Sequence, residues 1–347
     1  MLRDIRRHIS RVVFPFRAHY SAFHSTRRQH VLPMTRPTQP KERPIMLTTT
    51  GKLAYYVTLL IVAVSLVEAA VLTWRRSRQP EPFDWNEVWL SLADLAGRKL
   101  LALVPLSLAT PLFDFAWAHR LFTIPVHSVA LGLLVFVGQE FCYYWYHRAS
   151  HRVRFFWSTH AVHHSPNQLT LSSAFRLGWT GKIAGAAMFF TPLVWLGVRP
   201  EAVLAILSFN LMYQFWLHNT WMPKLGWLEY VFNTPSAHRV HHASNLDYLD
   251  ANYGGVLIVF DRLFGTYVAE RADEPCRYGL VTPTRSRNPF VVELEHWASL
   301  ARDVATARDV WTAIRFVMLP PGWRPGNLGE TTEELRRRSL VAVRTDA

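Results

Sequence analysis

The chain has 347 residues, of which half are hydrophobic and 14 are tryptophan, and its formal net charge is +13. Several apolar stretches approach membrane-spanning length, which indicates an integral membrane protein. The two cysteines, Cys142 and Cys276, exclude a disulfide framework. Residues 1–45 carry +8 of the charge, from ten Lys/Arg and two acids, so the other 302 residues carry only +5. No basic stripe with interleaved aromatics follows, which excludes nucleic acid and favours a membrane surface as partner.

The first 45 residues are rich in arginine, poor in acids and end in a run of prolines. They are therefore expected to form a basic, disordered extension. Three interpretations fit this segment: a targeting sequence, a basic arm on anionic lipid, or a start codon assigned too early. Met46 directly precedes the first apolar run, and this favours the last of the three.

Five apolar segments follow and are expected to be helical. They are 53–74, 100–117, 123–145, and a tight hairpin made of 183–198 and 202–217. Pro105 and Pro111 lie in the second segment, where a membrane helix can tolerate them. Glu68 is the one acid of the first segment, and it is expected either to have a function or to reach the membrane interface.

The basic residues between these segments predict their orientation. The connector after the first segment carries five Lys/Arg, whereas the next short loop has only Arg120. The excess of positive charge places this connector in the cytoplasm. Segments 123–145 and 202–217 then end on the cytoplasmic side as well.

Histidines are concentrated in the middle third of the chain, after the third and fifth apolar segments. They form one H-x3-H box, two H-x2-H-H boxes and a single residue before the last box: His147 and His151; His160, His163 and His164; His238, His241 and His242; and His218. Residues three and four apart share a helix face, so each box points two imidazoles the same way. Nine histidines exceed what one tetrahedral zinc can use. The pattern therefore predicts two metal ions in a nitrogen-rich cage.

The C-terminal part of the chain is more polar. An amphipathic helix is predicted over 291–318, either on the lipid surface or as a cover over the domain. Prolines end this helix, and about twenty residues at the end of the chain are expected to be disordered.

The histidine boxes exclude several kinds of metal site. A zinc protease of the H-E-x-x-H type needs a glutamate beside the first histidine, but Arg148, Ala161 and Arg239 occupy these positions. A haem site would use isolated histidines on facing helices, and a metal transporter would place its ligands at the bilayer midplane. The remaining interpretation is a non-haem iron pair that activates O2, placed where a lipid can enter from the bilayer.

The ordered boxes resemble the fatty acid hydroxylase and sterol desaturase superfamily of membrane di-iron oxygenases, over about residues 136–267. The flanking sequences look most like the alkylglycerol monooxygenase branch and its bacterial relatives; they are 143–148, 163–165, 171–176, 214–218, 233–236, 252–258 and 261–266. This resemblance implies O2-dependent hydroxylation of a lipid at two iron ions. For that branch it also implies tetrahydrobiopterin, or another external electron donor, as the reductant.

The resemblance also implies that all nine histidines, including His218, are metal ligands, with no catalytic residue apart from them. Ligating histidines usually donate their other ring N–H to an acceptor. Glu140, Asp250 and Asn252 are the predicted acceptors, and a turn is the alternative role for the last two. Arg176 and Arg239 are expected to face water rather than to anchor a lipid head group.

These observations predict an all-α integral membrane bundle with four to five spans and a cytoplasmic, histidine-rich helical cap. The expected regions are the 1–45 extension, N-terminal spans in 46–122, a catalytic domain in 123–270 and a cytoplasmic tail in 271–347. The expected partners are a lipid of alkylglycerol, sterol or fatty acyl type, O2, and an electron-donor protein or reduced pterin. A desaturase using the same site and a non-enzymatic metal transport or storage protein are the alternatives.

Overall fold

The fold is built from helices joined by irregular loops. The computed structural model describes residues 49–78, 80 and 82–345, so the predicted basic extension, 1–45, lies outside the described residues. Within these ranges the chain forms no β-strand, and isolated bridges pair Phe232 with Leu257 and Ala243 with Tyr278. The all-α prediction is confirmed.

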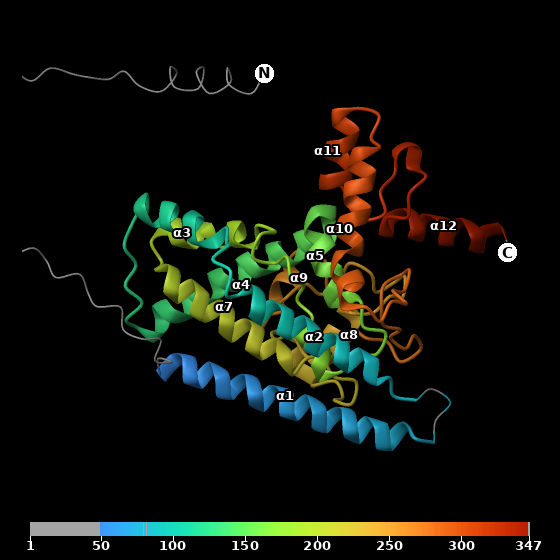
Figure 1. The fold of residues 1–347 in the computed structure, drawn as a ribbon, viewed down its shortest axis with the longest axis horizontal. Coiled ribbons are helices and arrows are strands. Elements are labelled where there is room, and N and C mark those ends of the chain that lie inside the picture. Colours follow the sequence, from blue (N-terminus) through green and yellow to red (C-terminus); the bar gives the residue numbers. More distant parts are fainter. Residues whose placement is uncertain (1–48, 79, 81, 346–347) are drawn as a thin grey trace, which may run out of the picture. The chain divides into compact units, whose positions relative to one another are not determined.

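Twelve α-helices and four 3-10 helices occupy the described part of the chain (Figure 1). The α-helices are α1 (Thr49–Arg76), α2 (Trp85–Leu101), α3 (Ala109–Ala118), α4 (Val129–Arg152), α5 (Arg154–His164), α6 (Thr191–Leu196), α7 (Pro200–Phe215), α8 (Pro235–His241), α9 (Val259–Leu263), α10 (Pro289–Ala305), α11 (Val310–Met318) and α12 (Thr332–Thr345). The 3-10 helices are η3 (Leu171–Phe175), η4 (Ala186–Phe189), η5 (Gly226–Tyr230) and η6 (Pro325–Asn327).

Helix α1 corresponds to the first predicted apolar segment. Among the described residues it is the one helix long and apolar enough to cross a membrane, over Lys52–Arg76. The C-terminal half packs on the start of α2, where Ala69 and Leu72 meet Phe83 and Val88. The side chains of the N-terminal half are largely exposed. The prediction of four to five spans is not established beyond this helix and stays a prediction.

Glu68 on α1 is buried and has two hydrogen-bond donors as partners. Its carboxylate accepts hydrogen bonds from the Leu171 backbone N–H at 2.7 Å and from the Trp221 indole N–H at 3.0 Å. A buried carboxylate is stable only where such donors compensate for its lost hydration. Glu68 therefore connects α1 to the start of η3 and to the segment that precedes η5.

The prediction of one helix over 100–117 is wrong. Helix α2 ends at Leu101, and α3 begins only at Ala109. Pro105 is the physical reason, because proline has no N–H to donate and disfavours a helical conformation of Val104 before it. The chain instead makes single turns, in which Leu103 N–H donates to Leu100 O and Val104 N–H donates to Leu101 O.

The third apolar segment, predicted over 123–145, forms a helix that both begins and ends later in the sequence. Helix α4 begins after Ser128, whose hydroxyl accepts the Leu131 N–H, and it continues through the first histidine box to Arg152. The first arm of the predicted hairpin contains only η4 and the short helix α6, whereas the second arm is helix α7. Gly197 joins the two arms in a left-handed conformation, with a φ of 114°.

Helices α3, α4, α6 and α7 enclose the main apolar core. Its fully buried members come from all four helices and their connections: Phe113, Ala116, Val135, Cys142, Tyr143, Phe190, Leu193, Val194, Val198 and Val203. This core packs α4 against α7. Tyr143, four residues before the first histidine box, also donates to the Gln214 side chain at 3.1 Å, near the end of α7 that precedes His218.

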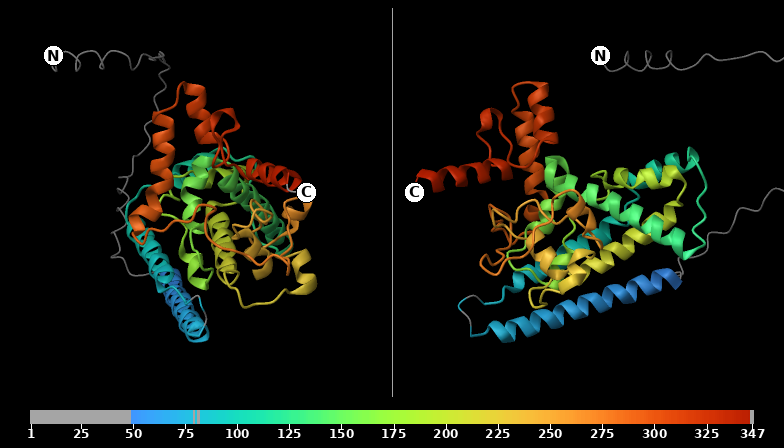
Figure 2. Two further views of the ribbon diagram at one scale, coloured as in Figure 1. Left: turned by 90° about the vertical axis from the view of Figure 1, so that its right-hand side faces the viewer. Right: turned by 180° about the vertical axis from the view of Figure 1, so that it is seen from behind.

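The tail differs from its prediction in two respects. The single helix expected over 291–318 is two helices, because α10 ends at Ala305 and Asp309 caps α11 by accepting the Thr312 N–H at 2.8 Å. Figure 2 shows α10 and α11 side by side, and α10 also packs along α5. The prediction of disorder over the last residues is also wrong, since α12 occupies Thr332–Thr345.

Candidate functional site

Helix ends bring all nine predicted histidines together. His147 and His151 lie in the last turns of α4, and the second box closes α5. The third box forms the end of α8, with His242 at its C-cap, and His218 follows α7. The nine rings lie in two groups: His147, His151, His160, His164 and His241; and His163, His218, His238 and His242. Within each group one ring nitrogen per histidine lies within 4.8 Å of all the others.

Backbone carbonyls set the tautomer of four of these rings. The Nδ1 atom of His147 lies 2.8 Å from Tyr253 O, and that of His163 lies 2.7 Å from Arg176 O. His218 and His241 make the same contact with Gln214 O at 2.8 Å and Ala251 O at 2.9 Å. A carbonyl only accepts, so each Nδ1 carries the proton and each Nε2 presents a bare lone pair.

These bare lone pairs point at one another. The Nε2 atoms of His163 and His218 face each other at 3.4 Å, although neither carries a proton to share. Of the described buried atoms without a hydrogen-bond partner, three more are the Nε2 atoms of His151, His164 and His241. Buried polar atoms are rarely left unpaired. A metal ion bound between the rings would accept these lone pairs and would account for both observations. The donor set therefore fits metal ions with nitrogen ligands.

Protonation of the imidazole rings does not take the place of bound metal ions. Burial, and then the neighbouring imidazoles, lower the pKa of His147, His241 and His242 well below the usual histidine value. Burial likewise lowers the pKa of His163 to about 4 and that of His218 to about 3. These five rings are therefore neutral at physiological pH, which is the form that binds metals.

The two histidine groups are in direct contact with each other. The rings of His164 and His242, one from each group, stack with their centroids 4.4 Å apart. His163 and His164 are consecutive residues of α5 and belong to different groups, with ring centroids 5.5 Å apart. This arrangement suits two neighbouring metal ions rather than two independent sites.

The three predicted acceptors have different roles. The Asp250 carboxylate lies 3.6 Å from Nδ1 of His151 and 2.7 Å from Arg152, as expected for a residue that orients a histidine. Burial acts to raise the pKa of Asp250, but His151 and Arg152 outweigh it and lower this pKa to about 2. Asn252, at a φ of 59°, bonds to Ala237 O and to both backbone groups of Val268, and so joins α8 to the segment around Val268.

Glu140 accepts hydrogen bonds from backbone N–H groups rather than from a histidine ring. Its carboxylate accepts hydrogen bonds from the backbone N–H groups of Val256 and Leu257, and from the Asn210 side-chain amide at 2.5 Å. These bonds hold α4 and α7 to the segment that follows Tyr253. Sequence reasoning missed the four carbonyl acceptors, because every residue has a carbonyl and no residue type marks the one that is used.

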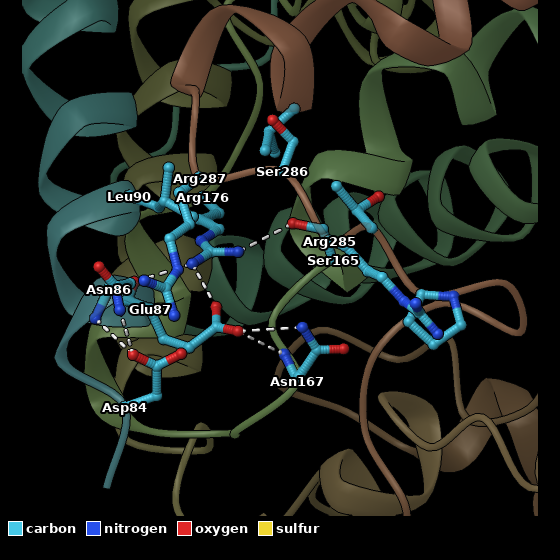
Figure 3. A pocket seen from close by; sticks show the side chains of 13 residues that line it. Asp84, Asn86, Glu87, Leu90, Ser165, Asn167, Arg176, Arg285, Ser286 and Arg287 are labelled. Atoms are coloured by element: carbon cyan, nitrogen blue, oxygen red, sulfur yellow. Dashed lines mark hydrogen bonds and ion pairs between the residues drawn. The ribbon is translucent and has the colours of Figure 1, made fainter.

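The expectation that Arg176 and Arg239 face water is wrong. Arg176 is buried, and its guanidinium donates to Glu87 at 2.5 Å and to Ser165 at 2.9 Å (Figure 3). It also donates to Ser91 at 3.1 Å. Arg239 is buried too and forms a two-pronged ion pair with Glu270. Neither is a free anchor for a head group, because a carboxylate already compensates each charge.

Two pockets lie in the described part of the chain, and the larger of them reaches the histidines. The larger, of about 530 Å³, ends at His160, His163 and His218, and its walls are mainly apolar: Phe113, Tyr143, Tyr146, Phe156, Phe190, Leu204, Leu207, Leu211 and Phe215. The smaller, of about 330 Å³, is polar and is lined in part by Asp84, Asn167 and Arg176 (Figure 3). The apolar cavity can hold a hydrocarbon chain with one carbon beside the histidine centre.

Fold and site together define an all-helical protein with a buried, neutral imidazole centre at the end of an apolar cavity. Residues 132–266 match the family model described as fatty acid hydroxylase. The chain therefore carries a fatty acid hydroxylase domain, and the resemblance inferred from the histidine boxes is confirmed. No solved structure shows a significant match to the chain.

Several curated proteins are similar to this chain. An alkylglycerol monooxygenase of Xenopus tropicalis is 33% identical over 264 residues, which are 76% of this chain and 58% of the relative. The alkylglycerol monooxygenase of Homo sapiens is 35% identical over 74% of this chain and 57% of its own length. An ornithine lipid hydroxylase of Rhizobium tropici is 29% identical over 56% of this chain and 60% of its own. The chain thus spans less than two thirds of these relatives.

The buried ion pair of Arg176 generates a stability prediction. Glu87→Gln leaves Arg176 buried without a counter-charge, so we expect the free energy of unfolding to fall by about 3–5 kcal/mol. Thermal unfolding of the purified protein measures this as a lower Tm. The matched control is Asp273→Asn, whose carboxylate pairs with Arg271 at the surface and which is expected to leave Tm nearly unchanged. Equal Tm values for the two variants would contradict the analysis.

Asp250 generates a prediction about metal affinity. Asp250→Asn keeps the side-chain shape and tolerates the φ of 55°, but it removes the charge that orients His151. We expect affinity for iron to fall by about 10–100-fold, measured by iron retention during titration with a chelator. Asp247→Asn, at a neighbouring exposed position, is the control. Retention equal to that of the unaltered protein would exclude this role of Asp250.

Proposed function

We propose that this protein is a membrane-bound non-haem di-iron oxidoreductase that uses O2 to hydroxylate a lipid. One observation carries the proposal: unprotonated Nε2 atoms of buried histidines converge at the inner end of an apolar cavity. The names of the relatives, alkylglycerol monooxygenase and ornithine lipid hydroxylase, support the same class of reaction.

The nine histidines would hold the metals, five in one group and four in the other. Iron bound there would supply O2 activation, which no side chain of the protein can provide alone. The residues of the chain position and protect this chemistry. The backbone carbonyls orient the rings, and the apolar walls keep water away and align the lipid chain.

The balanced reaction requires an external reductant. A C–H bond and O2, with two electrons and two protons, yield C–OH and water. We infer that the electrons come from a reduced pterin, such as tetrahydrobiopterin, or from an electron-donor protein. Arg176 supports delivery of these electrons from the polar pocket. Its guanidinium lines that pocket, and its backbone carbonyl accepts a hydrogen bond from the His163 N–H.

The proposed location is a membrane, with the histidine centre on the cytoplasmic side. Helix α1 supports membrane insertion by its length and apolarity. The basic connector that follows it supports the orientation, since positive loops remain in the cytoplasm. The catalytic unit is then 123–270, preceded by N-terminal spans in 46–122 and followed by a cytoplasmic tail in 271–347.

Isotope labelling of lipids tests this proposal. Cells that express the intact protein are grown under 18O2 beside cells with His163→Ala or His241→Ala. We expect one lipid to gain a single labelled oxygen only with the intact protein, and both variants to retain less iron. His127→Ala, at an exposed histidine outside the two groups, is the control and should behave as the intact protein.

The outcomes separate the proposal from its alternatives. A lipid that loses two hydrogens without gaining label would identify a desaturase that uses the same centre. A changed metal content without any lipid product, in cells supplied with reductant, would favour metal transport or storage. Full hydroxylation by either histidine variant would refute the assignment of the centre.

A further inference from the structure

The apolar cavity has a charged end that the chemistry above does not use. Its lining includes three charged side chains, Arg98, Lys99 and Lys182, and all three are basic. Among the described residues that line the cavity, none is Asp or Glu. A cavity with only positive charge favours an occupant with negative charge.

Arg98 does not contribute a free charge. Its Nε donates to Asp94 at 2.6 Å and its Nη2 donates to Phe175 O at 2.6 Å. The two lysines differ from it, because within the described chain neither ammonium forms a hydrogen bond or an ion pair. Two uncompensated ammonium groups therefore remain on the cavity wall.

A backbone hydrogen bond connects the loop after the helix that carries Lys99 to the segment that carries Lys182. Lys99 lies in the last turn of α2, just before the Pro105 break, and Lys182 lies between η3 and η4. Leu108 N–H donates to Lys182 O at 3.2 Å, which connects the loop after α2 to the Lys182 segment. Both lysines are exposed, whereas His163 and His218 are buried, so the lysines mark the outer end of the cavity.

The cavity is thus amphipathic along its length, with cations outside, hydrocarbon walls between, and the imidazole centre inside. A neutral glycerol head group offers only hydroxyls, which form weaker hydrogen bonds with ammonium than anionic oxygens do. An anionic head group is attracted by the uncompensated charge of each ammonium group on the cavity wall. The charge therefore favours an anionic head group over a neutral one.

We infer that the lipid taken by this cavity carries a phosphate or carboxylate, which Lys99 and Lys182 hold while its chain extends to the histidine centre. This inference rests on the proposed function, because it assigns the head group of the lipid that would be hydroxylated. It makes the two lysines specificity determinants, and their carbon stems complete the apolar wall.

Equilibrium binding in neutral detergent tests the inference without turnover. The probes are hexadecyl phosphate, hexadecanoate and 1-O-hexadecylglycerol, which share one chain and differ in head group. We expect Lys99→Gln/Lys182→Gln to weaken binding of at least one anionic probe by about tenfold or more, and binding of the glycerol ether much less. Lys99→Arg/Lys182→Arg keeps the charge and should retain most of the affinity. The anion that binds more tightly identifies the head group.

A matched control separates the cavity from general surface charge. Lys52→Gln/Lys224→Gln removes the same charge at two exposed lysines that do not line the cavity, and it should leave all three affinities unchanged. Equal losses in both double variants would overturn the inference, because the effect would then come from the micelle surface. An equal loss for all three probes would overturn it too. Absence of 18O-labelled lipid would instead count against the proposed function, whatever the binding data show.

Discussion

The histidine centre depends on one constraint, the pairing of Nδ1–H groups with backbone carbonyls. Four carbonyls, from Arg176, Gln214, Ala251 and Tyr253, each take the proton-bearing nitrogen of one histidine. This pairing orients each of these four rings so that its bare Nε2 faces the other histidines. Without it, a histidine could turn its lone pair to any nearby donor, and the two groups would not converge.

The carbonyls must in turn be held rigidly, and buried acids do this. Asp261 accepts the N–H groups of Tyr253 and Gly254, both at 2.7 Å, while Glu140 accepts the next pair, Val256 and Leu257. Burial raises the pKa of Asp261 to about 6, and its hydrogen bonds counteract this shift. The segment that supplies Ala251 O and Tyr253 O is thus clamped at several points. These acids support the centre without touching a histidine ring.

Arg176 connects the centre to the rest of the fold in a similar way. Its carbonyl binds His163, and its guanidinium binds Glu87 of α2 and Ser165, which follows the second box. One buried residue therefore links α2, α5 and a metal-facing ring. Arg176 lines the polar pocket, whereas its neighbour Leu177 lines the mostly apolar cavity. This asymmetry suits a reaction in which a lipid is oxidised with electrons from a water-soluble donor.

The sequence by itself determined the helical class, the family, and the nine histidines that come together. It could do so because helical spacing places each box on one face, and because nine clustered histidines have few other uses. It also pointed to Asp250 beside His151. The division of His163 and His164 between two groups was decided only by the tertiary structure, since rings on adjacent residues point in different directions. The same holds for the carbonyl acceptors and the buried pairs of Arg176 and Arg239, because their partners lie far away in sequence. The break at Pro105 was foreseeable from its missing N–H, but whether neighbouring helices would compensate for it depended on packing that no local pattern encodes.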